Sequence, residues 1–146
     1  MIKIAHRGNT LGSIPDFEND PDYIINAIKM GYEVEIDVWF NDEKIMFGHD
    51  EPQYYVRPDQ FNIILPNAWF HCKSLETLEH FVKFQHNQRY FWHQQDDFTL
   101  TSHKYIWTYP NKDVTDISIL VDLDLSSGID YKKVYGVCTD YPELLG

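Results

Sequence analysis

Apolar residues fall into short blocks along the chain, and most of these blocks have the pattern of β-strands. Two longer stretches instead repeat their apolar residues with the period of an amphipathic helix. The first begins near Pro21 and ends at Gly31, and the second follows Ser74, a residue type that often caps a helix N-terminus. The predicted strands are residues 2–5, 33–40, 44–47, 69–73, 90–93, 105–108, 117–121 and 134–138. Strands that alternate with helices at this spacing predict βα units and a mainly parallel sheet.

The connections between the last strands are too short, or too rich in Pro, Gly and Asp, to form full helices. The strands that they join, 117–121 and 134–138, are nevertheless apolar, and uncovered apolar strand faces are costly in water. A symmetric homodimer that buries this side of the sheet is the simplest remedy. The alternative is a monomer in which aromatic side chains such as Tyr105, Trp107 and Tyr109 fold over the gap.

The formal net charge of −11 argues against functions that need a basic surface, such as nucleic-acid binding or docking on anionic membranes. A phosphate site in so acidic a chain must supply its own local positive charge. No apolar run is long enough to span a bilayer, and Met1 leads straight into a predicted strand, so we expect neither a transmembrane segment nor a signal peptide. Cys72 and Cys138 lie inside apolar strand-like runs, which favours buried free thiols and a cytoplasmic location.

The tripeptide His6-Arg7-Gly8 directly follows the first predicted strand. In isolation it is a common turn with a solvated histidine. At the carboxyl end of a strand, however, His and Arg occupy the place where α/β barrels carry their catalytic side chains. Gly48-His49-Asp50 follows the strand at 44–47 in the same way. His6 and His49 are therefore candidates for an acid/base pair.

Glu35 and Asp37 lie two residues apart in a strand that is otherwise β-branched and apolar. The strand period places both carboxylates on one face, with Val34, Ile36 and Val38 on the other. An edge strand with a solvated acidic face explains the pair equally well. In a central strand, by contrast, the two carboxylates need a cation to offset their desolvation. Such oxygens suit Mg²⁺ or Ca²⁺, and the two side chains should then approach within ~5 Å of each other.

Further candidates lie on the later strands. His71 and Lys73 share one strand face, and a lysine beside an acidic site can contact a phosphate, although an exposed lysine before a helix is the simpler interpretation. His93, at the end of the strand at 90–93, is a candidate substrate contact. Trp107 either lines the pocket or fills the core. Together the candidates supply an acid/base pair, a cation site and positive charge for a phosphate, as phosphodiester cleavage requires.

With these motifs in view, the chain resembles a known family, the glycerophosphodiester phosphodiesterases of the phosphatidylinositol-phospholipase-C-like barrels. The shared motifs are H-R-G at 6–8, E-N at 18–19 (similar to the family's P-E-N-T), E-I-D at 35–37, H-D at 49–50, a lysine at 73 and G-V-C-T-D-Y-P at 136–142. They are ordered and span nearly the whole chain. The resemblance implies an α/β fold in which residues 1–146 form a single reduced TIM-barrel-like (βα) domain. Several outer helices must be missing, because the chain is much shorter than the ~250 residues typical of such barrels.

The resemblance also implies roles for individual residues. These are His6 and His49 as the catalytic acid and base, Glu35 and Asp37 as metal ligands, and Arg7 and Lys73 as cations that neutralise the phosphate. Where the family usually has a third carboxylate, two residues before the lysine, this chain has His71. An imidazole can ligate a divalent ion but favours Zn²⁺ or Mn²⁺ over Ca²⁺. We therefore expect a divalent metal cofactor, Mg²⁺ or Ca²⁺, with Mn²⁺ and Zn²⁺ as alternatives.

The sequence thus predicts a phosphodiester hydrolase that cleaves a small phosphodiester by metal-assisted acid–base catalysis with two histidines. The attacking group is either water or a substrate hydroxyl next to the phosphate, which would give a cyclic intermediate. The alternative from another class is a non-catalytic binding module for a phosphorylated glycan or a lipid headgroup. A pure binder, however, has no need for an acid/base pair. Glycerol diesters, lysolipids and phosphodiester-linked polysaccharides all fit as substrates.

Overall fold

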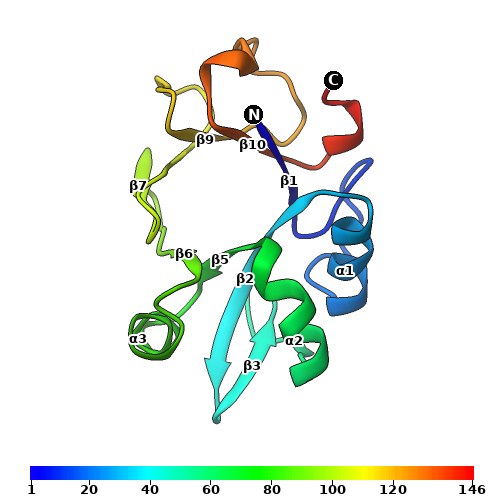
Figure 1. Cartoon of the computed structure of the whole chain (residues 1–146), viewed down its shortest axis with the longest axis vertical. Coiled ribbons are helices and arrows are strands. Elements are labelled where there is room, and N and C mark those ends of the chain that lie inside the picture. The colour runs from blue at the N-terminus through cyan, green and yellow to red at the C-terminus, as the bar shows by residue number, and fades with distance from the viewer.

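The computed structural model describes residues 1–146, and its strands form one mixed, ten-stranded sheet that curls into a half-barrel (Figure 1). The strands are β1 (Ile2–His6), β2 (Glu33–Asn41), β3 (Lys44–Phe47), β4 (Tyr54–Tyr55), β5 (Ala68–Cys72), β6 (Arg89–Phe91), β7 (Phe98–Leu100), β8 (Ile106–Thr108), β9 (Ser118–Val121) and β10 (Gly136–Thr139). The α-helices are α1 (Pro21–Lys29), α2 (Pro58–Ile64) and α3 (Leu75–Phe84), and the 3-10 helices are η1 (Leu65–Asn67), η2 (Tyr131–Lys133) and η3 (Pro142–Leu144). The paired strands run in the order β4-β3-β2-β1-β10-β9-β8-β7, with β5 added to β2 and β6 added to β5.

The predicted reduced TIM-barrel-like (βα) domain is wrong, because the molecule is mostly sheet and lacks a ring of outer helices. In such a barrel each parallel strand leads into a helix. Here β2 instead turns back into β3 as an antiparallel hairpin, and β7 pairs antiparallel with β8. Asp42 and Glu43 form the β2–β3 turn with positive φ angles of 50° and 62°, as a type I′ hairpin turn requires. The connections that precede β9 and β10 contain no α-helix either.

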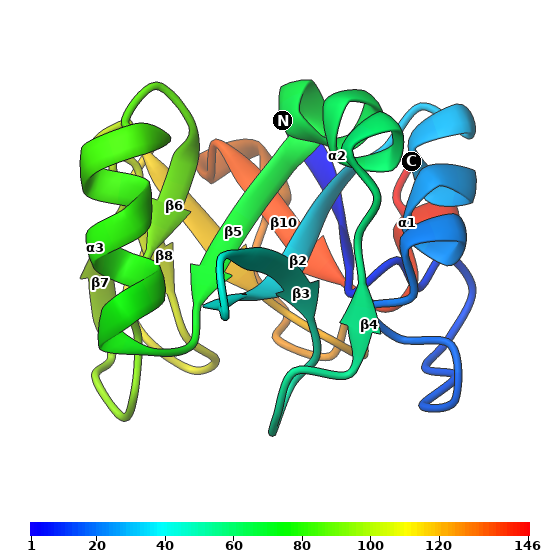
Figure 2. The same ribbon diagram turned by 90° about the horizontal axis from the view of Figure 1, so that it is seen from below.

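The three α-helices lie outside the sheet (Figure 2), and two of them pack directly on β2. Val34, Ile36 and Val38 are fully buried in this outer core, so the alternation predicted for the strand is confirmed. The predicted helix starts are confirmed as well. Asp20 caps α1 by accepting a hydrogen bond from the Asp22 N–H, and Ser74 caps α3 in the same way. The longest helix has ten residues, and none is long and apolar enough to cross a membrane.

The inner side of the curled sheet is filled by a second core rich in aromatic rings. β6 pairs only with β5, and β7 only with β8, so no strand ladder closes the ring. Two other kinds of contact bridge the open side. Ser102 donates its N–H to the Tyr90 carbonyl and accepts the Tyr90 N–H on its hydroxyl, both at 2.9 Å. The ring of Phe91 stacks on Trp107 with centroids 4.5 Å apart, and Trp107 is only 2% exposed.

The outer faces of β9 and β10 are covered by the chain itself. Leu120 and Val137 are fully buried and pack with Val134 and Leu145. Side chains from the connections before β9 and β10 complete this cover; they are Val114, Leu125, Ile129 and Tyr131. The predicted homodimer rested on these faces being uncovered, so the structure removes its physical basis.

Candidate active site

A pocket of about 410 Å³ opens at the carboxyl ends of the parallel strands. The structure brings to this pocket every site residue that the sequence predicted, namely His6, Arg7, Glu35, Asp37, His49, His71, Lys73 and His93. They come from β1, β2 and β5 and from the segments that follow β1, β3, β5 and β6. β1, β2, β5 and β6 are parallel neighbours, so the residues at their carboxyl ends meet at one edge of the sheet. His49 joins them from the loop after β3, which runs antiparallel to β2.

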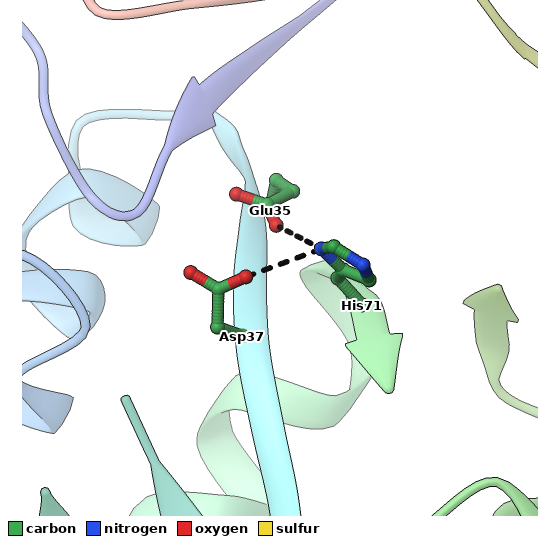
Figure 3. Close-up of side chains that lie close together, drawn as sticks. All are labelled: Glu35, Asp37 and His71. Carbon is green, nitrogen blue, oxygen red and sulfur yellow. Dashed lines mark ion pairs between the residues drawn. The ribbon is translucent and has the colours of Figure 1, made fainter. Parts of the chain in front are cut away.

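Glu35 and Asp37 point from β2 toward His71 on the neighbouring strand β5 (Figure 3). The register of the two strands pairs Asp37 with His71 directly. His71 Nδ1 lies 3.2 Å from Asp37 Oδ1 and 3.9 Å from Glu35 Oε1. One candidate ligand atom from each residue lies within 4.8 Å of the other two, so the predicted approach of the two carboxylates is confirmed.

This cluster is buried and incompletely hydrogen-bonded. Glu35 and Asp37 are 4% and 1% exposed, and Glu35 Oε2 and Asp37 Oδ1 have no hydrogen-bond partner. A carboxylate oxygen that is buried without a partner destabilises the fold unless a cation compensates for its desolvation. The two unpaired oxygens and the adjacent imidazole nitrogen therefore fit a divalent ion of the kind that binds two carboxylates and a histidine.

The protein environment shifts the pKa values of Glu35 and Asp37 in opposite directions. Burial raises the pKa of Glu35, and the neighbouring charge of Asp37 raises it further. Burial acts on Asp37 in the same direction, but the adjacent His71 imidazole and the charge of Arg7 outweigh it and hold the pKa of Asp37 well below its usual range. The environment thus favours the charged form of Asp37 and disfavours that of Glu35, whereas a bound cation would favour the charged form of both.

His71 is held in an orientation that suits a metal ligand. Its Nε2 lies 3.2 Å from the carbonyl oxygen of His93, and its ring stacks on Phe91 at 5.0 Å between centroids. When Nε2 donates its proton to this carbonyl, the lone pair of a neutral imidazole is on Nδ1, which faces the two carboxylates. Such a carbonyl contact is the usual means of orienting a metal-bound histidine.

Arg7 and Asn19 hold Asp37 from the opposite side. Asn19 donates its side-chain amide to Asp37 Oδ2 at 2.9 Å and accepts the Asp37 N–H on its own oxygen at 3.1 Å. Arg7 Nε lies 3.0 Å from the same Oδ2, and Arg7 Nη1 donates to Glu18 Oε2 at 3.2 Å. Arg7 has a φ of 55°, an uncommon backbone conformation for a residue other than glycine and one that concentrates at functional sites.

His6 is paired with a carboxylate that sequence reasoning did not identify. His6 Nδ1 lies 2.8 Å from Asp140 Oδ1, while Nε2 lies 3.8 Å from Glu35 Oε2. Burial lowers the pKa of His6, but the hydrogen bond to Asp140 and the charge of Glu35 outweigh it, so the pKa is raised overall. Asn9 also donates to Asp140 Oδ1, at 2.9 Å, which fixes the carboxylate in place.

The remaining predicted residues line the rim of the pocket. His49 is exposed, with Nδ1 at 2.8 Å from Asp50 Oδ1. Lys73 Nζ lies 3.9 Å from Asp37 Oδ1. The ring of His93 stacks on Tyr109 with centroids 3.6 Å apart, and its Nε2 lies 2.6 Å from the carbonyl oxygen of Asp96.

The fixed charges of the pocket can balance one another. Arg7 Nε and Lys73 Nζ lie 3.0 Å and 3.9 Å from oxygens of Asp37, so these two cations can balance the charges of Glu35 and Asp37. An anionic ligand would add a further negative charge, which a divalent ion or a protonated histidine would have to balance.

Sequence reasoning missed several residues that build the site, above all Asp140 and Asn19. Both lie in motifs on which the family resemblance rests, T-D-Y-P and E-N, and this was the only signal that could have found them. Tyr109 is a further pocket residue without a motif. Burial raises the pKa of its hydroxyl, and the charge of Glu35 adds to this effect, so it remains a neutral phenol that faces the acidic cluster.

Comparisons of the chain with protein-family models, with curated proteins and with solved structures found no match. The resemblance to glycerophosphodiester phosphodiesterases therefore rests on the motifs of the sequence. Because a fold alone does not specify a function, the activity has to be argued from the chemistry of the pocket.

Proposed function

We propose that the protein is a metal-assisted phosphodiester hydrolase similar to the glycerophosphodiester phosphodiesterases. The observation that carries this proposal is the convergence, in one pocket, of three kinds of group. They are a histidine backed by a carboxylate, a carboxylate–imidazole cluster with two unpaired buried oxygens, and two fixed cations. Each answers a separate requirement of phosphodiester cleavage: proton transfer, stabilisation of phosphoryl charge, and substrate binding.

Glu35, Asp37 and His71 would hold the divalent ion. Its two carboxylate ligands favour Mg²⁺ or Ca²⁺, whereas the imidazole also admits Mn²⁺ or Zn²⁺. When bound, such an ion acts as a Lewis acid that polarises the phosphoryl oxygens. Asn19 and Arg7 keep Asp37 in its ionised, ligand-ready state.

His6 is the general base of the proposed reaction. Asp140 at Nδ1 holds the ring in the tautomer that leaves Nε2 unprotonated and directed toward Glu35 and the pocket. Nε2 is therefore the atom that takes a proton from the attacking hydroxyl group. The same arrangement stabilises the imidazolium that results, because the negative charge of Asp140 lies beside it.

His49 is the second member of the acid/base pair. Its Nδ1 is also occupied by a carboxylate, Asp50, so its Nε2 is the free nitrogen. At the rim of the pocket the imidazolium form of His49 donates the proton on Nε2 to the leaving oxygen. Arg7 and Lys73 bind the negatively charged phosphoryl oxygens, and the guanidinium can do so with two parallel hydrogen bonds.

The cellular compartment of the protein is inferred from a different observation. Cys72 and Cys138 are both free and buried, so the fold does not depend on a disulfide or on an oxidising compartment. A cytoplasmic phosphodiesterase is consistent with these thiols.

Hydrolysis of bis(para-nitrophenyl) phosphate with and without the two histidines tests the proposed function. His6→Ala and His49→Ala should each lower kcat by ~10²–10⁴-fold while circular dichroism and the melting temperature remain close to wild type. His86→Ala, outside the pocket, is the matched control and should retain full turnover. A wild-type protein that binds the diester without cleaving it would overturn the enzymatic proposal in favour of a binding module.

A further inference from the structure

His6 and Arg7 are neighbours in the sequence, but each side chain is held by a carboxylate from a different part of the chain. Asp140, just after β10, holds His6. Glu18, in the loop between β1 and α1, holds Arg7. The segment after β10 lies beside this loop (Figure 1), and the Gly12 N–H donates to the Asp140 carbonyl at 2.7 Å. The proposed base and the proposed phosphate-binding cation therefore have two separate supports.

One side chain, that of Asn9, is hydrogen-bonded to both supporting carboxylates. Its Nδ2 donates to Asp140 Oδ1 and to Glu18 Oε1, each at 2.9 Å. No other side chain is hydrogen-bonded to both. Asn9 is fully buried, so water does not compete for these two bonds. Hydrogen bonds to an ionised acceptor are also about twice as strong as those between neutral groups.

The other partners of Asn9 fix the orientation of its amide. Oδ1 accepts from the Tyr23 hydroxyl at 2.9 Å and from the Ile14 N–H at 3.2 Å. A side-chain amide has two N–H donors and an oxygen with two lone pairs, so its full hydrogen-bonding capacity is used. A carboxylate at this position would offer no donor to Asp140 and Glu18. An apolar side chain would leave all four partners without a bond.

The turn that ends β1 depends on Asn9 as well. The Asn9 N–H donates to the His6 carbonyl at 2.9 Å, and the two residues between them, Arg7 and Gly8, have φ angles of 55° and 91°. Positive φ at both central residues is the mark of a type I′ turn. A residue other than glycine keeps such a conformation only where its surroundings fix it. Asn9 thus holds the backbone of Arg7 as well as the carboxylate that binds its guanidinium.

We propose that Asn9 is a positioning residue, which ties the carboxylate that holds His6 to the carboxylate that holds Arg7 and so fixes the general base relative to the bound phosphate. This inference rests on the proposed function, from which His6 and Arg7 take their roles. Asn9 does not line the pocket, so it acts only through these two residues. Positioning of this kind has a large effect on rate, since a displacement of about 1 Å can cost about 10²-fold.

Asn9→Ala and Asn9→Asp separate positioning from packing, with hydrolysis of bis(para-nitrophenyl) phosphate as the measurement. Loss of the amide donors should lower kcat by about 10–100-fold and also raise KM, because His6 and Arg7 each lose a support. Asn9→Asp keeps the shape of the side chain but places a third carboxylate against Asp140 and Glu18. It should therefore impair turnover at least as much as Asn9→Ala, whereas a residue that only fills space would give the opposite order.

Thr77→Ala is the matched control. Thr77 is also a fully buried polar residue, and its hydroxyl accepts the Phe40 N–H at 2.7 Å, which joins α3 to β2 outside the pocket. Both Thr77→Ala and Asn9→Ala remove a buried hydrogen-bonding group, so both should lower the melting temperature. Only the Asn9 variants should change kcat and KM.

Tyr23→Phe tests the same contacts if the Asn9 variants do not fold. It removes only the hydroxyl that donates to Asn9 Oδ1 and should lower kcat/KM by about fivefold, as expected for one ordinary hydrogen bond. Three results would overturn the inference while leaving the hydrolase intact: folded Asn9 variants with the kinetic constants of Thr77→Ala, an Asn9→Asp milder than Asn9→Ala, or, where neither folds, wild-type kcat/KM in Tyr23→Phe. A wild-type protein that does not cleave the diester would instead refute the proposed function itself.

Discussion

The raised pKa of His6 results from opposing effects that single substitutions can separate. Burial alone lowers this pKa, and Asp140 and Glu35 together raise it. Asp140→Asn removes one of the two raising groups, so the pKa of His6 should fall, as measured by NMR titration of the imidazole in metal-free protein. Asp50→Asn, which changes the hydrogen-bond partner of His49, is the control and should leave the pKa of His6 unchanged.

The same substitution has a kinetic consequence at His6. A general base must be unprotonated, so the rate rises with pH through the pKa of His6. In Asp140→Asn this rising limb should move to lower pH, while kcat falls by ~10²–10⁴-fold because the ring loses its orienting partner. An unchanged pH–rate profile in this variant would exclude His6 as the base.

Individual site residues were predictable from the sequence where the strand period or a motif marks them. Glu35 and Asp37 interrupt an apolar strand at a spacing of two, which is unusual enough to be informative. Asp140 reaches His6 across 134 residues of sequence, and no local pattern records that contact. The pairing of His6 with Asp140 could be recognised only once β1 and β10 were known to lie side by side in the sheet.

Among the structural elements, the loop that carries His49 depends on a glycine. A Cβ at Gly48 would collide with the Glu51 carbonyl oxygen, so Gly48→Ala must displace this tight loop. We expect a loss of about 1–3 kcal/mol in the free energy of unfolding measured in urea, together with reduced turnover because His49 moves. Gly146→Ala is the matched control, since nothing lies within 4 Å of its Cβ position and its φ is outside the left-handed region. Wild-type stability in Gly48→Ala would show that the loop adapts.

Elements with a strong periodic signal were predicted correctly, and weak ones were missed. α1 and α3 combine an amphipathic pattern with a side-chain cap, and their predicted starts are confirmed. α2 has seven residues, begins after Arg57 and lacks a Ser, Thr, Asp or Asn cap, so its signal is faint. The apolar period of β3 is the same in a parallel or an antiparallel strand, and for this reason the sequence could not reveal that β2 turns back on itself.

For the whole molecule, the covered outer faces of β9 and β10 lead us to expect a monomer in place of the homodimer. Leu120 and Val137 are already fully buried by the chain's own loops, so dimerisation would bury little further apolar surface there. Light scattering at micromolar concentration should give a mass near 17.4 kDa. A mass near twice this value would restore the homodimer and place its interface elsewhere on the surface.

The overall architecture was the least predictable feature, because it depends on how the sheet closes. The motifs implied a barrel with outer helices, but the open side between β6 and β8 is bridged by aromatic stacking and by Ser102. Such contacts depend on the three-dimensional neighbours of a strand and leave no period in the sequence. The predicted residues nevertheless lie in one pocket, because most of them come from the carboxyl ends of adjacent parallel strands, and the loop after β3 adds His49.

The metal dependence of diester hydrolysis tests the central claim most directly. Protein treated with EDTA and shown by elemental analysis to be metal-free should not cleave bis(para-nitrophenyl) phosphate. Titration with Mg²⁺, Ca²⁺, Mn²⁺ or Zn²⁺ should restore turnover in the wild type and fail to restore it in Asp37→Asn, which weakens the ligand cluster. Full turnover by the metal-free protein, or no turnover with any of these ions, would contradict the account.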